Sequence, residues 1–168
     1  MSSLNSPKNA ICSSLTTLLL LFACVSCDQN LMFSDSQRVN ESGWDYDDHI
    51  AFDVDVQDST ILYDFLVEVR NRTDYAYSNL FLFITTTFPD GSVAADTLEC
   101  PLAAPDGRWY GKNSGHYIDS RFFLRQRVRF PFKGVYHFDC THGMRDSSLV
   151  GIRNVGLRIE KSSTTKQQ

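Results

Sequence analysis

The stretch Ile50-Ala-Phe-Asp-Val-Asp-Val56 alternates apolar residues with small or acidic ones along its whole length. Successive side chains of a β-strand point to opposite faces, so this period of two predicts a strand with one buried face and one exposed face. The stretch Tyr63-Asp-Phe-Leu-Val-Glu-Val-Arg70 repeats the pattern with acidic and basic residues on its polar face. Two half-buried strands in succession indicate an antiparallel sheet.

The sequence after these two strands continues the same organisation. Residues 80–88 are rich in aromatic and β-branched residues and apolar on both faces at the start, which is typical of a central strand. Pro89-Asp-Gly91 predicts a turn, and a hairpin strand is expected through Thr97-Leu-Glu-Cys100. Further strands are predicted within residues 122–130, 136–140 and 155–160.

No stretch keeps a helical period for more than two turns, so the sequence predicts an all-β fold. About seven short strands with frequent turns fit a single antiparallel β-sandwich domain of the jelly-roll kind, over residues 44–161, followed by a polar tail at 162–168. Of 168 residues, 42% are hydrophobic and 21% are charged, a globular composition. The net charge of -4 gives no attraction to nucleic acid, so we expect no nucleic-acid partner.

The N-terminal segment predicts export and lipidation. Residues 1–26 read as a signal peptide, because Lys8 precedes an apolar run at 15–23 that is shorter than the roughly 20 residues a membrane-spanning helix needs. The residues that follow resemble the lipobox of bacterial lipoproteins, with Cys27 as the lipidated residue and Cys24 as the alternative. Residues 27–43 are then the lipidated N-terminus and a polar tether. Two or three acyl chains hold a protein durably on a membrane.

Several short motifs are similar, in this order, to the gliding motility lipoprotein GldH family of Bacteroidetes. They are Tyr77-Ser-Asn-Leu-Phe-Leu-Phe83, Asp96-Thr-Leu-Glu99, Gly107-Arg-Trp-Tyr-Gly111, Phe130-Pro-Phe-Lys-Gly-Val-Tyr-His-Phe138, His142-Gly-Met-Arg145 and Leu149-Val-Gly-Ile-Arg-Asn-Val-Gly-Leu-Arg-Ile-Glu160. The resemblance implies an accessory lipoprotein of the gliding apparatus, which is linked to type IX secretion, with protein partners and no catalytic residues to transfer. It implies a place in the cell envelope, anchored to the inner or the outer membrane and facing the periplasm.

Two surface features are candidates for partner binding. Arg121, Arg125, Arg127 and Arg129 alternate with apolar residues and are expected on one exposed strand face. They either block unwanted strand pairing at a sheet edge or dock an acidic protein. Trp109 lies in a glycine-rich loop. It either caps one end of the core or stacks on a sugar ring, so the alternative function is a glycan-binding module on a lipid anchor.

Export also makes the remaining cysteines informative. Cys100 and Cys140 both fall in predicted strands, where they form either a disulfide across the sandwich or two buried free thiols.

Metal binding and catalysis have weaker signals. No H-E-x-x-H or G-x-S-x-G pattern occurs, so we expect no metal, no cofactor, no small-molecule substrate and no enzymatic activity. The acidic cluster near the first strand lacks the spacing of a calcium loop, and pairing with the arginine row is the alternative interpretation. Its members are Asp45, Asp47, Asp48, Asp53, Asp55 and Asp58.

Overall fold

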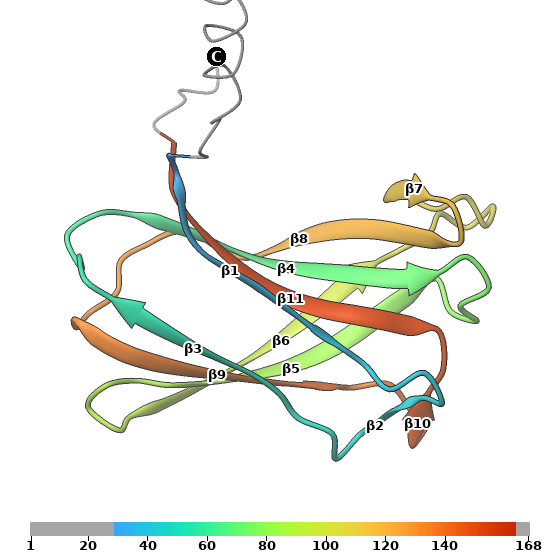
Figure 1. Ribbon diagram of the computed structural model, residues 1–168, viewed down its shortest axis with the longest axis horizontal. Coiled ribbons are helices and arrows are strands. Elements are labelled where there is room, and N and C mark those ends of the chain that lie inside the picture. Colours follow the sequence, from blue (N-terminus) through green and yellow to red (C-terminus); the bar gives the residue numbers. More distant parts are fainter. Residues whose placement is uncertain (1–28, 164–168) are drawn as a thin grey trace, which may run out of the picture.

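The computed structural model of the chain describes residues 29–163, and over this range the backbone forms strands, turns and loops without a helix (Figure 1). Nothing in this range could therefore span a membrane as a helix. The predicted signal peptide, both candidate lipidation sites, Cys24 and Cys27, and most of the polar tail lie outside the described residues.

Two antiparallel sheets form the two layers of a sandwich (Figure 1). The five-stranded sheet has the order β1 (Leu31–Arg38), β11 (Ile152–Lys161), β4 (Tyr63–Arg72), β8 (Tyr117–Val128) and β7 (Lys112–Ser114). The four-stranded sheet has the order β3 (Ile50–Val56), β9 (Gly134–His142), β5 (Asn79–Thr87) and β6 (Val93–Pro101). A short ladder of β2 (Trp44–Asp45) and β10 (Ser148–Leu149) completes the described strands. The prediction of an all-β sandwich is confirmed.

The core lies between the two sheets and follows the alternation that the sequence shows. In β3 every second residue is buried, and Val54 and Val56 are fully inaccessible. In β4 Phe65, Val67 and Val69 face the same core. Burial of these apolar side chains supplies the main stabilising free energy, about 25 cal/mol for each Å² removed from water.

The β5–β6 hairpin confirms the turn that was predicted at Pro89-Asp-Gly91. The Gly91 N–H donates to the Phe88 carbonyl at 2.9 Å, and Gly91 has φ of 83°, which glycine adopts without steric cost. The Asp90 carboxylate accepts hydrogen bonds from the main chain and side chain of Ser92, and the Ser92 hydroxyl lowers its pKa.

The N-terminal part of the sandwich differs from the prediction. Leu31–Arg38 was assigned to the polar tether, but it forms β1 and pairs with β11 from Leu31↔Glu160 to Arg38↔Asn154. The physical reason is that β1 is an edge strand with only three half-buried residues, so its sequence shows too little apolar alternation to predict a strand.

Candidate functional site

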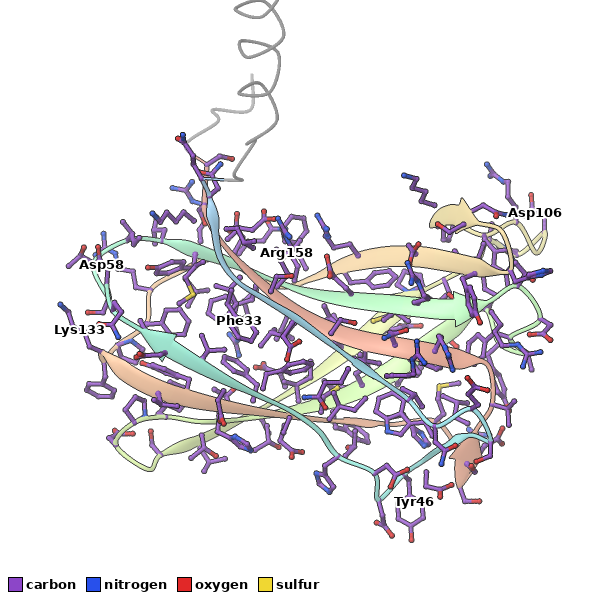
Figure 2. The ribbon with its side chains drawn as sticks, in the orientation of Figure 1. Phe33, Tyr46, Asp58, Asp106, Lys133 and Arg158 are labelled. Carbon is purple, nitrogen blue, oxygen red and sulfur yellow. The ribbon has the colours of Figure 1, made fainter. Side chains whose placement is uncertain are left out.

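The two sheets meet differently along their two long sides. On one side β1 lies against β3, where the rings of Phe33 and Phe52 pack edge to face with centroids 6.4 Å apart. Figure 2 shows Phe33 reaching from β1 into the space between the sheets. The side-chain amide of Gln37 donates a hydrogen bond to the carbonyl of Ala51. We call this side, formed by β1 and β3, the closed edge.

On the other side β6 and β8 leave a cleft of about 410 Å³ between the sheets. Its floor is aromatic and includes Phe65, Phe130, Tyr136 and Phe138. The Phe130 ring lies 5.1 Å from that of Phe65 and 4.7 Å from that of Tyr136. We call this side the open edge, and the space between its strands the cleft.

One ion pair crosses the mouth of the cleft. The Arg125 guanidinium of β8 donates two hydrogen bonds to the Asp96 carboxylate of β6, at 2.5 and 3.2 Å. The side chains are 51% and 22% exposed, so water screens the attraction and its contribution to stability is small. We call this pair the latch. It joins the two sheets over an apolar floor without filling the space beneath it.

Irregular pairing of β8 with β4 turns Arg125 toward the latch. Leu66 lies opposite Phe123, whereas its neighbour Phe65 lies opposite Arg125, and a second shift follows before Val128. Each shift is a β-bulge, which places extra residues on one strand and changes where their side chains point. Arg127 within this irregular stretch has φ of 54°.

The bulges break the arginine row that the sequence predicts. Arg121 lies on the outer sheet face and pairs with Glu68 at 2.6 Å, Arg125 forms the latch, and Arg129 lines the cleft beyond the end of β8. The Arg127 main-chain N–H donates to Asp64. Within residues 29–163 the side chains of Arg127 and Arg129 form no ion pair. The expectation of four arginines on one regular face is therefore wrong, and two of them leave a free positive charge at the open edge.

Trp109 lies in the loop between β6 and β7, half-buried and packed against the core. Its backbone forms an isolated bridge with Ala103, and the neighbouring Tyr110 side chain is 59% exposed. Because the Trp109 ring packs on the core, this geometry matches the core-capping alternative of the two that the sequence left open.

Cys100 and Cys140 are buried free thiols, and the disulfide alternative is wrong. Cys100 lies opposite Leu80 and Cys140 opposite Ile84, so β5 separates them. Two strand spacings amount to roughly 10 Å, whereas the Cα atoms of a disulfide lie about 4.4–6.8 Å apart. Burial raises the pKa of both thiols to about 12.

The acidic cluster does not pair with the arginine row, so that interpretation is wrong. Asp53 instead contacts His137 at 2.7 Å, and Asp58 accepts hydrogen bonds from Thr60, which lower its pKa. In the described part of the chain no three His, Cys, Asp or Glu side chains gather in a way that could hold a metal ion. His142 is buried against Trp44, with ring centroids 5.3 Å apart, and burial lowers its pKa.

By its fold, this protein is a small all-β sandwich domain with one closed edge and one open edge. The family model of the GldH lipoprotein matches residues 31–159, from the first residue of β1 almost to the end of β11, and the chain belongs to this family. Membership in a lipoprotein family supports attachment to a membrane of the cell envelope.

Two curated relatives agree with this assignment. The gliding motility lipoprotein GldH homolog of Christiangramia forsetii is 36% identical over 151 residues, covering 86% of this chain and 91% of the relative. Gliding motility lipoprotein GldH of Flavobacterium johnsoniae is 34% identical over 154 residues, covering 88% and 93%. Among solved structures, dimeric latent PorU from Porphyromonas gingivalis aligns with 83% of this chain and 14% of its own, at 9% identity and a TM-score of 0.33, a likeness too slight to carry an argument.

Proposed function

We propose that this chain is a non-catalytic accessory subunit of the gliding-motility and type IX secretion machinery, anchored by lipid on the periplasmic side of a cell-envelope membrane. The names of its curated relatives support a role in gliding. The single observation that carries a role in protein contacts is the open edge, where an aromatic cleft is lined by Arg129, which has no ion-pair partner among residues 29–163.

The chemistry of the open edge favours docking over catalysis. Asp96 is the carboxylate that lines the cleft, and both of its oxygens already accept hydrogen bonds from Arg125. A carboxylate whose two oxygens are already occupied in this way is poorly placed to take a proton from a substrate. Aromatic floor and basic rim together match the anatomy of an interaction hot spot, in which aromatic and arginine side chains predominate.

Gene deletion and complementation test the cellular role. Deletion is expected to impair surface movement or the profile of secreted proteins, and the wild-type gene should restore it. Cys27→Ser is expected to abolish restoration by releasing the protein from the membrane, with Cys24→Ser as the matched control. Unchanged movement and secretion after deletion would contradict the proposed role.

Site-specific photo-crosslinking tests the role in protein contacts. A photoreactive residue at Arg127, on the open edge, is expected to capture a defined envelope protein, whereas one at Ser34, exposed on β1, should not. Equal capture at both positions would contradict a role for the open edge. Turnover of an envelope substrate by the purified protein would contradict the non-catalytic part of the proposal.

A further inference from the structure

The edge strand β6 is the most regular uncovered edge of the sandwich. It pairs with β5 over all nine residues, Val93–Pro101, without a register shift, and no other described strand lies beside it. The edge of β8 is irregular by comparison, since its pairing with β4 shifts twice. The edges of β1 and β3 lie against each other at the closed edge. A regular, uncovered edge presents unpaired backbone donors and acceptors to an extended chain.

The side chains beneath the β6 edge leave room for the side chains of an added strand. Alternate residues of β6 point into the sandwich, and two of these, Ala94 and Asp96, line the cleft. Ala94 is small, and the floor below it carries the rings of Phe65, Phe130 and Phe138. A strand added beside β6 would extend the four-stranded sheet across the mouth of the cleft. Every second side chain of that strand would then face the aromatic floor.

The charges at the rim of the cleft determine which charge is favoured in a bound segment. Arg129 lines the cleft. Arg127, two residues earlier in the sequence, is exposed. Neither side chain has an ion-pair partner among the described residues. The protein as a whole carries a net charge of -4, so a positive rim here is a local feature and not a general property of its surface. Such a rim attracts carboxylates and disfavours a basic segment.

We infer that the open edge binds an extended acidic segment of a partner protein, which adds as a strand to β6 and inserts an aromatic or aliphatic side chain into the cleft. This inference rests on the proposed role in protein contacts and specifies its chemistry. Backbone hydrogen bonds to β6 hold the segment, the inserted side chain sets its register, and its carboxylates pair with Arg129 and Arg127.

Synthetic peptides of the length of β6, nine residues, provide the first test. The probe is Thr-Glu-Thr-Phe-Thr-Glu-Thr-Val-Thr with blocked ends, which places glutamate and phenylalanine on one face of a strand. The controls replace phenylalanine with alanine or both glutamates with lysine. Saturable binding of the probe is expected, with each control weaker by about tenfold or more. Hydrogen exchange should slow at the amides of β6 and stay unchanged at β3.

Charge reversal at the rim provides the second test. Arg129→Glu is expected to weaken the glutamate peptide by about tenfold and to strengthen the lysine peptide. Arg145→Glu is the matched control, because Arg145 is an exposed arginine between β9 and β10 that forms no ion pair within the described part of the chain. Both variants alter surface side chains, so a difference between them reports the site and not the folding of the domain.

Three results would overturn the inference: no binding of any peptide, protection of another edge in place of β6, or equal effects of the two reversals. Self-association of the free protein through β6, seen as concentration-dependent protection of that strand, would identify a second copy as the occupant and also reject the acidic segment. Crosslinking from Arg127 in cells is independent of the peptides. A captured partner with no peptide binding therefore rejects this inference and leaves the proposed function standing.

Discussion

The closed and open edges of the sandwich join the same two sheets by opposite means. At the closed edge, Phe33 and Phe52 make apolar contact and Gln37 bonds directly to a backbone carbonyl of the facing sheet. At the open edge, the Arg125–Asp96 latch spans the two sheets above a cleft of about 410 Å³. Apolar contact excludes water and stabilises the fold, whereas an exposed ion pair contributes little and exchanges readily with solvent or with another charged group.

Stability and accessibility are therefore divided between the two sides of the sandwich. The closed edge contains β1, the first described strand, and packs the N-terminal part of the domain onto the facing sheet. The open edge is the side that remains available to a partner.

The largest expected effect comes from the floor of the cleft. Phe130 is 4% exposed and contacts the rings of Tyr63, Phe65 and Tyr136. Phe130→Ala should lower the free energy of unfolding by about 3–5 kcal/mol, measured by urea denaturation. The control is Phe123→Ala on β8, 52% exposed, for which a change below about 0.5 kcal/mol is expected. Equal losses in the two variants would mean that the cleft floor is not part of the packed core.

The next largest loss of stability is expected at the closed edge. Phe33→Ala removes the ring that joins β1 to β3, and because Phe33 is only partly buried the expected loss is about 1–2 kcal/mol. Amide exchange should accelerate in β1 and β3 but not in β6. Ser34→Ala, exposed on the same strand, should leave stability and exchange unchanged. A neutral Phe33→Ala would show that the closed edge is not held by apolar contact.

Sequence patterns predicted the core strands of the sandwich better than its two edges. The alternation in Ile50–Val56 and the turn at Pro89-Asp-Gly91 both correspond to observed structure, because local residue order determines them. Strand β1 was missed, since a half-exposed edge strand resembles a polar linker. The latch was missed for another reason. Arg125 and Asp96 are 29 residues apart and meet only because bulges in β8 redirect Arg125, and a period-two pattern contains no information about bulges.

Away from both edges, the contact of His142 with Trp44 makes the stability of the protein depend on pH. Burial lowers the pKa of His142 below its ordinary value of 6.5, although Asp45 and Asp146 partly oppose this. Below pH 6.5 the unfolded chain therefore binds a proton that the folded protein resists, and stability falls as the pH falls, with a slope of at most about 1.4 kcal/mol per pH unit. His142→Phe keeps the ring contact and should reduce this slope when unfolding is measured between pH 7.5 and 5. An unchanged slope would assign the pH dependence to other groups.

The smallest expected effect on stability is that of the latch, and its smallness is what distinguishes the two edges. In a double-mutant cycle of Asp96→Asn and Arg125→Gln, the coupling free energy should be about 0.2–1 kcal/mol, because Arg125 is 51% exposed. Hydrogen exchange near the cleft should nevertheless accelerate in either single variant, since the mouth loses its one bidentate contact among the described residues. A coupling above about 2 kcal/mol, equal to or larger than the loss from Phe33→Ala, would mean that charge holds this side as firmly as apolar packing holds the other. The open edge would then have to break a strong contact before it could admit a partner, and a docking role for it would be untenable.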